Sequence, residues 1–164
     1  MRNNIALIGC LLGFVLLFAA CSGNTVYERY QSIPQDTWDM NDSMHFEVNM
    51  EDTVGHYQVL LLIKHTHDYP YQNLWLFTQS MAPDSTLATD TLECFLADNS
   101  GKWLSQSFIS EREMPLIYMQ RIRFPKSGTY TFDITHGMRD SLLRGVSRIG
   151  LSIELINSST NVQE

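Results

Sequence analysis

The chain has 164 residues, 44% of them hydrophobic, and a formal net charge of −7 at pH 7. This length suits one domain with a genuine core, and the acidic balance makes nucleic acid an unsuitable partner because its phosphates would be repelled. Neither an internal repeat nor a low-complexity tract is visible. We therefore expect one folded domain that does not bind nucleic acid.

The first segment is a short apolar run that predicts secretion. Arg2 supplies a positive charge, and the uncharged run IALIGCLLGFVLLFAA follows over residues 5–20. A membrane-spanning helix needs about 20 residues, whereas a charged start, a shorter apolar middle and a small-residue end are typical of a secretory signal. We expect residues 1–20 to form a signal peptide.

The residues that close this signal predict a lipid anchor. In FAAC, Ala19 and Ala20 stand directly before Cys21, which resembles a bacterial lipobox with Phe18 where leucine is usual. Small residues fit a signal peptidase, and the thiol of Cys21 can accept a diacylglycerol. Two or three acyl chains anchor a protein stably, whereas one binds marginally. An ordinary signal cleaved nearby and an uncleaved anchor are the alternatives.

The segment after the cysteine predicts a tether. Residues 21–43 mix polar residues with Pro34 and isolated aromatics, a composition that lets an anchored domain stand off the lipid. The SGNT that follows Cys21 contains no acidic run that would direct export to the outer cell surface. We expect attachment to the periplasmic face of an outer membrane.

Strand patterns then fill residues 44–156. MHFEVNM alternates apolar and polar residues, as in a half-buried strand, and YQVLLLIKHT is apolar on both faces, as in a central one. Turn residues separate further strand patterns at residues 72–79, 89–98, 102–109, 114–124, 128–135 and 148–155. They predict an all-β fold, a single antiparallel β-sandwich of jelly-roll or immunoglobulin-like type. Residues 157–164 are expected to form a flexible tail.

One segment departs from the strand pattern. In HGMRDSLLRGV, residues 136–146, Met138, Leu142 and Leu143 recur at helical spacing. This spacing predicts one short helix near the C-terminus, or a turn, between the last two strands.

The stretch HTHDYPYQNLWLF, residues 65–77, holds the first candidate binding residues. His65 and His67 would share a strand face and could supply two zinc ligands, but no spacing indicates a third, so no metal is predicted. DYPY is turn chemistry. In the following strand, apolar residues point both ways, which favours a strand covered on both faces; an exposed aromatic ridge that binds a partner or a sugar is the alternative.

Five residues form the predicted binding set. Trp103 follows a turn and is expected to cap the core, while Arg139 ends a strand, where a structural salt bridge is favoured over a partner contact. The candidate binding residues are Tyr69, Tyr71, Trp75, Trp103 and Arg139.

Catalysis has little support in the sequence. Cys94 is the one cysteine left after signal removal and lipidation, so no internal disulfide can form; its phase on a strand predicts a buried, inert thiol. Nucleophile-elbow, phosphate-loop and HExxH motifs are absent. Asp84 and Asp90 could be imagined as an acid–base pair, but they lie among turn-forming residues. We expect no catalytic residue and no cofactor.

Several stretches together resemble a known family. The lipobox cysteine, YPYQNLWLF, DTLECFLADNSGKW, GTYTFDITHGMR and GVSRIGLSIEL occur in the same order as in gliding-motility lipoproteins of the GldH type from Bacteroidetes, over residues 21–156. The family often has glutamine where this chain has His136. The resemblance implies a membrane-anchored accessory of the gliding machinery, tied to type IX secretion, that contacts other envelope proteins and has no enzymatic activity. A carbohydrate-binding sandwich lipoprotein is the alternative.

Overall fold

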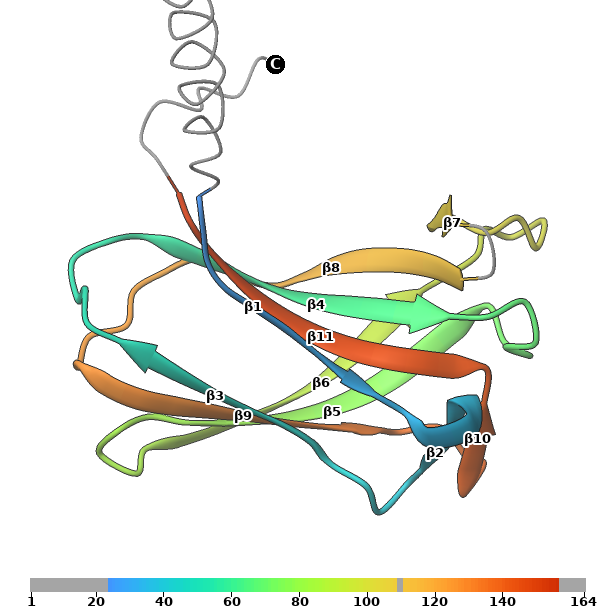
Figure 1. Ribbon diagram of the computed structural model, residues 1–164, viewed down its shortest axis with the longest axis horizontal. Helices are drawn as coiled ribbons and strands as arrows, with labels where there is room; N and C mark the ends of the chain where they lie inside the picture. Colours follow the sequence, from blue (N-terminus) through green and yellow to red (C-terminus); the bar gives the residue numbers. More distant parts are fainter. Residues whose placement is uncertain (1–23, 109–110, 157–164) are drawn as a thin grey trace, which may run out of the picture.

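The computed structural model describes residues 24–108 and 111–156 as two facing layers of antiparallel strands (Figure 1). Cys21 and the predicted tail, residues 157–164, lie outside the described residues. The elements are β1 (Thr25–Ser32), the 3-10 turn η2 (Pro34–Asp36), β2 (Thr37–Asp39), β3 (Met44–Met50), β4 (Tyr57–His65), β5 (Asn73–Met81), β6 (Leu87–Phe95), β7 (Gln106–Phe108), β8 (Glu111–Ile122), β9 (Gly128–His136), β10 (Leu142–Arg144) and β11 (Val146–Leu155).

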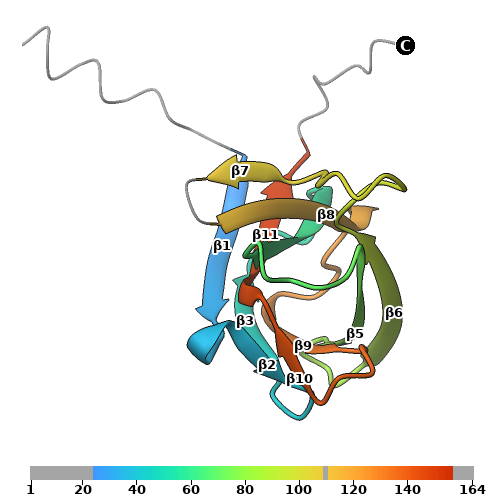
Figure 2. The same cartoon turned by 90° about the vertical axis from the view of Figure 1, so that its right-hand side faces the viewer.

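The strand order identifies the type of sandwich. One sheet has the order β1-β11-β4-β8-β7, and the facing sheet has the order β3-β9-β5-β6. Successive long strands cross repeatedly between the two layers, which Figure 2 shows end-on. This is the jelly-roll arrangement of eight long strands in two sheets. The predicted antiparallel β-sandwich is confirmed, and of the two types left open by the sequence the jelly roll is the one formed.

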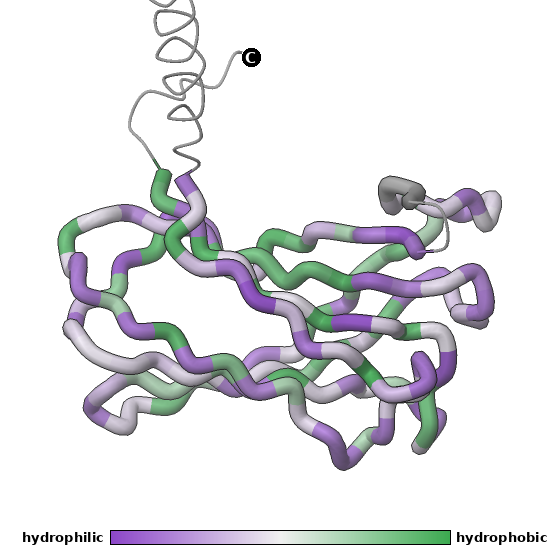
Figure 3. The backbone as a smooth tube through the Cα atoms, viewed as in Figure 1, coloured by the Kyte–Doolittle hydropathy of each residue, from purple (hydrophilic) through white to green (hydrophobic). Residues whose placement is uncertain are grey.

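Alternation of apolar and polar residues explains the two layers. Along β3 the apolar residues are buried and the intervening polar residues exposed, and the tube in Figure 3 changes between hydrophobic and hydrophilic in the same way. In the central strand β4, Val59, Leu61 and Ile63 point inward and are fully buried, while Leu62 is buried on the opposite face. The core therefore lies between the sheets, as the period-two pattern predicts.

The predicted C-terminal helix is wrong. Leu142–Arg144 form β10, which pairs with β2 and places Leu143 opposite Trp38, both fully buried. Gly145 then turns the chain with φ of +87°, and a Cβ at this position would lie 2.5 Å from the backbone of Tyr69. The described residues contain no α-helix, because three apolar residues at helical spacing stabilise less than a buried strand pairing beside this tight turn.

The sheet also contains residues that the sequence assigned to the tether. β1 pairs with β11 from Thr25, opposite Glu154, to Ser32, opposite Arg148. β1 is an edge strand with mostly exposed side chains, so its composition is that of a linker although its backbone is paired. Within the described part of the chain, no helix is long and apolar enough to cross a bilayer.

Candidate functional site: a groove on the uncovered sheet

The two faces of β5 have different surroundings. Leu74 and Leu76 point into the core and are fully buried, whereas Trp75 is 37% exposed and Phe77 is 50% exposed. No described element lies over this outer face of the β3-β9-β5-β6 sheet (Figure 1). The favoured prediction, a strand covered on both faces, is therefore wrong, and the alternative of an exposed aromatic ridge describes this strand.

The exposed side chains line a groove of about 450 Å³. Residues of β5 and of the turn before it form one wall, and the loop that follows β9 forms the other. The lining residues are Tyr71, Asn73, Trp75, Phe77, Gly137, Met138 and Arg139. We call this set the aromatic groove.

Backbone contacts hold the two walls together. The Gly137 N–H donates to the Trp75 carbonyl at 2.7 Å, and the Trp75 N–H donates to the Met138 thioether Sδ at 3.3 Å. A Cβ at position 137 would lie 2.9 Å from the Phe77 ring, so glycine is needed for the ring to pack on the loop. The groove is thus built on a continuation of the sheet ladder, which fixes the spacing of its two walls.

Tyr71 and Arg139 supply the polar edge of the aromatic groove. The Tyr71 hydroxyl donates to Asp140 Oδ2 at 2.6 Å, and this hydrogen bond raises the pKa of Tyr71. Arg139 is exposed and makes no ion pair with any described residue. The salt bridge that the sequence favoured is therefore not formed among them, and the guanidinium is available to a partner.

Two predicted binding residues lie elsewhere. Tyr69 is buried, its hydroxyl donates to the Asn73 carbonyl at 2.7 Å, and burial raises its pKa. Trp103 is half-buried, and its ring centroid lies 4.6 Å from that of the buried His65. Both close the end of the core, as expected for Trp103. The structure thus brings Tyr71, Trp75 and Arg139 together in the groove, while Tyr69 packs behind Tyr71 in the core with a ring-centroid distance of 5.9 Å and Trp103 lies outside the groove.

Sequence reasoning missed Asn73, Phe77 and Met138 as lining residues. Phe77 could have been found, because its two-residue spacing from Trp75 puts both side chains on one face of the strand. Met138 could not, since it enters the groove through the path of the chain after β9.

A second, more polar groove of about 390 Å³ continues from Phe77 along the same face. It is lined by threonines and by Asp90 and Asp133. Asp133 lies 2.7 Å from His45 Nδ1, and this hydrogen bond raises the pKa of His45. The two grooves together form an elongated surface across β9, β5 and β6.

The acidic residues considered for catalysis have separate structural partners. Asp84 pairs with Lys126, which lowers the pKa of that carboxyl to about 2, and the Tyr118 hydroxyl donates to Asp90 Oδ2 at 2.8 Å. Cys94 is buried, as predicted, and burial raises its thiol pKa to about 12, which favours the less nucleophilic thiol form.

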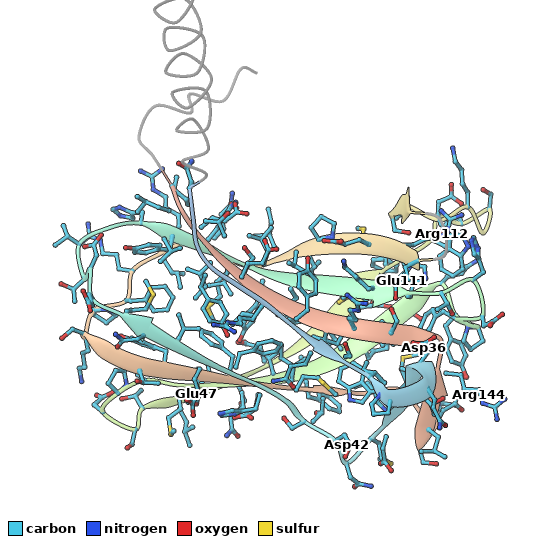
Figure 4. The ribbon with its side chains drawn as sticks, viewed as in Figure 1. Asp36, Asp42, Glu47, Glu111, Arg112 and Arg144 are labelled. Atoms are coloured by element: carbon cyan, nitrogen blue, oxygen red, sulfur yellow. The ribbon has the colours of Figure 1, made fainter. Side chains whose placement is uncertain are left out.

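Charged side chains also gather at the end of the sandwich that carries the aromatic groove. Figure 4 shows Asp36 and Arg144 at this end, Asp42 on the loop at the bottom of the view, and Glu47 on the outer side of the uncovered sheet. No group of three or more His, Cys, Asp or Glu side chains in the described ranges is placed to hold a metal ion.

Comparisons with known proteins agree with each other. A family model described as GldH lipoprotein matches residues 25–153. A curated gliding motility lipoprotein GldH homolog from Christiangramia forsetii is 31% identical over 85% of this chain and 90% of its own length. The gliding motility lipoprotein GldH of Flavobacterium johnsoniae is 26% identical over 88% of this chain and 92% of its own length.

Among solved structures, the VP2 subviral particle of infectious bursal disease virus matches with a TM-score of 0.38 and 14% identity. That match covers 83% of this chain and 34% of the viral chain.

Proposed function

Since the chain belongs to the GldH lipoprotein family of gliding-motility lipoproteins, we propose that it acts without catalysis, through protein contacts within the gliding and type IX secretion machinery. Acyl chains on Cys21 hold the domain on the periplasmic face of the outer membrane. The aromatic groove is the contact surface.

The position of the anchor supports this arrangement. Cys21 and Thr25 are four residues apart, a span of at most about 14 Å at roughly 3.5 Å per extended residue. Thr25 pairs with Glu154, next to Leu155, which pairs with Tyr57 at the start of β4. A lipid on Cys21 therefore keeps this end of the sandwich near the bilayer.

The aromatic groove belongs to the opposite end. β4 runs away from Tyr57 to His65, whose ring centroid lies 5.9 Å from that of Tyr69, and Tyr69 in turn contacts Tyr71 of the groove. At about 3.3 Å per residue, the nine residues of β4 span roughly 30 Å. The groove is thus directed away from the lipid, toward proteins of the periplasm.

The observation that carries the proposal is the uncovered aromatic surface itself. Exposed apolar patches rimmed by polar residues mark contact sites, and aromatic and arginine side chains are the usual anchors of protein interfaces. A sugar site would need free hydrogen-bonding groups beside the rings. Here the Tyr71 hydroxyl is bound to Asp140 and the Asn73 amide donates to Glu93 at 2.6 Å. Arg139 remains available, and an arginine beside exposed aromatic rings is typical of protein interfaces, so protein contact is favoured over sugar binding.

Two variants in the native host test the two halves of the proposal. Cys21→Ala should lose fatty-acid labelling and membrane fractionation, with loss of colony spreading and secretion. Trp75→Ala combined with Arg139→Glu should remain membrane-bound but lose spreading and secretion. Val54→Ala is the control for the groove variant, because Val54 is 74% exposed and lies outside the groove.

Each result has a clear reverse. The lipid anchor would be contradicted if the Cys21→Ala variant carried no lipid label and still fractionated with membranes as fully as the wild type. Normal spreading and secretion by a folded groove variant would contradict the contact surface, and binding of the wild type to a glycan array would favour the carbohydrate alternative.

A further inference from the structure

Within residues 24–108 and 111–156, the outer edge of β6 is a long strand edge with no neighbouring strand. Among the described strands, β1, β7, β3 and β6 end the two large sheets. β7 has three residues, and β1 and β3 lie beside each other, since the Gln31 side chain donates to the His45 carbonyl. β6 has nine residues and lies at the margin of the molecule (Figure 2).

The hydrogen-bonding phase shows which backbone groups of β6 are free. The Leu96 N–H donates to the Gln72 carbonyl at 2.8 Å, and the Ala82 N–H donates to the Thr86 carbonyl at 2.9 Å. With the uninterrupted register between the strands, the even-numbered residues of β6 bond to β5. In an antiparallel ladder the residues between them point their N–H and C=O groups the other way. These residues are Leu87, Thr89, Thr91, Glu93 and Phe95.

The side chains of the same residues lie on the uncovered face. Glu93 is opposite Trp75 and Thr91 is opposite Phe77 in the sheet, so this edge borders the aromatic groove. Leu87 and Phe95, at the two ends of the strand, are each 57% exposed. A strand added here would bond to the backbone and reach the groove with its side chains.

Three of the usual protections against pairing are absent from β6. Natural edge strands are blocked by lysine, proline or a bulge, yet β6 contains no proline and its register with β5 has no shift. Residues 65–101 contain no Lys or Arg at all, while Asp90 and Glu93 lie on β6. The edge is therefore open and acidic.

We propose that β6 binds an extended segment of a partner protein by strand addition, and that this segment alternates basic with apolar side chains. Main-chain hydrogen bonds give affinity in this mode, and alternate side chains give specificity. Basic residues complement Glu93, whose side chain lies on the uncovered face beside Trp75, whereas a second copy of this chain would bring another acidic edge against this one. The proposal rests on the proposed function, because it names the kind of partner that the uncovered face receives.

The test uses the full-length lipidated protein in detergent micelles and a fluorescein-labelled peptide of about nine residues in which lysine alternates with valine. Fluorescence anisotropy should show binding, and the same peptide with glutamate in place of lysine should bind at least about tenfold more weakly. Hydrogen exchange should slow at the amides of Leu87, Thr89, Thr91, Glu93 and Phe95 and not at the even-numbered amides between them.

Matched substitutions separate backbone pairing from adsorption. Thr91→Pro removes one outward N–H and should weaken binding about tenfold, while Thr91→Val, which keeps the N–H, should bind as wild type. Ser32→Pro is the control on the β1 edge: the Ile33 N–H donates to the Ser147 carbonyl, so the Ser32 N–H points outward in the same phase. Thermal unfolding checks that both proline variants are folded.

Glu93→Lys keeps the backbone N–H groups of β6, and this variant should bind the glutamate peptide more tightly than the lysine peptide. Equal binding of both peptides to every variant, exchange protection without the odd–even alternation, or a dimer formed through β6 in light scattering would each overturn the proposal. Because these are binding measurements, they can fail while groove variants still abolish spreading in the host, and the proposed function would then survive without strand addition.

Discussion

Both sheets of the sandwich turn apolar side chains outward. On one sheet the central Leu62 is covered although Ile117 stays 52% exposed, and on the other the outward aromatic side chains of β5 are uncovered. On the β1-β11-β4-β8 sheet, Leu62 is 6% exposed because Tyr30 lies across it and over Gly150. The Tyr30 hydroxyl donates to Glu113 at 2.9 Å, and Lys64 Nζ lies 4.5 Å above the ring and 3.1 Å from Glu113. On the opposite sheet, Trp75 and Phe77 have no such cover.

The difference teaches what closing a sheet face requires. Tyr30 lies against Gly150, and its polar end is held by Glu113 and Lys64. Trp75 and Phe77 have the glycine, Gly137, but it serves to shape a groove. The exposed aromatic face is therefore a built surface, which is the state expected of an interface whose partner is absent.

The largest expected effect compares the two sides of β5. Leu76→Ala should lower the free energy of unfolding by about 3 kcal/mol, because it leaves a cavity at a fully buried position. Phe77→Ala, one residue away on the uncovered face, should lower it by less than about 1 kcal/mol. Urea unfolding measures both, and equal losses would mean that the outer face is covered in solution.

Substitution of two glycines tests how firmly Tyr30 and Phe77 are held on their sheets. A Cβ at Gly150 would lie 2.7 Å from the Tyr30 ring and 3.1 Å from Leu62, so Gly150→Ala should cost about 2 kcal/mol by displacing a ring held on three sides. Gly137→Ala meets the half-exposed Phe77 ring, which can swing into solvent, and should cost under about 1 kcal/mol. Thermal unfolding measures the loss of stability in both variants. A larger loss for Gly137→Ala than for Gly150→Ala would contradict the role given to Tyr30.

The histidines should give opposite pH dependences. Burial lowers the pKa of His136, so below about pH 6.5 the unfolded chain takes up a proton that the folded chain refuses, and stability falls by up to roughly 1.4 kcal/mol per pH unit. His136→Gln should flatten this fall. The bond to Asp133 raises the pKa of the exposed His45, so its contribution is present below about pH 6.5 and is lost as the pH rises through its folded pKa.

Denaturant unfolding at pH 5.5, 6.5 and 7.5 measures this contrast, with His45→Gln as the second variant. If the free energy of unfolding of the His136→Gln protein changed with pH as steeply as that of the wild type, this histidine would be protonated equally in the folded and unfolded states.

The smallest effect on stability concerns the tryptophans. Trp75→Phe should change the free energy of unfolding by less than about 0.5 kcal/mol but remove most of the emission that acrylamide quenches, because Trp38 is fully buried and Trp103 half-buried. Quenching that persists unchanged would mean that Trp75 is shielded.

Sequence reasoning predicted most of the fold from local patterns. The alternation in MHFEVNM and the central apolar run of YQVLLLIKHT correspond to β3 and β4, since a strand's side-chain period is a local property. It failed where pairing is long-range: β1 lies in a stretch with linker composition, and β10 lies in one with helical spacing. The site shows the same division, because Trp75 was found as an aromatic on a strand while Met138 reaches the groove from a distant loop.

The amino-acid order alone was enough to indicate a sandwich of antiparallel strands, an acidic chain and a lipobox cysteine, because periodicity, charge and short motifs are written along the chain. Which face of β5 remains uncovered, and which strand ends the sheet, depended on how segments far apart in sequence pack against one another. No local pattern carries that information, since an outward-pointing tryptophan has the same spacing whether a neighbouring layer covers it or solvent does.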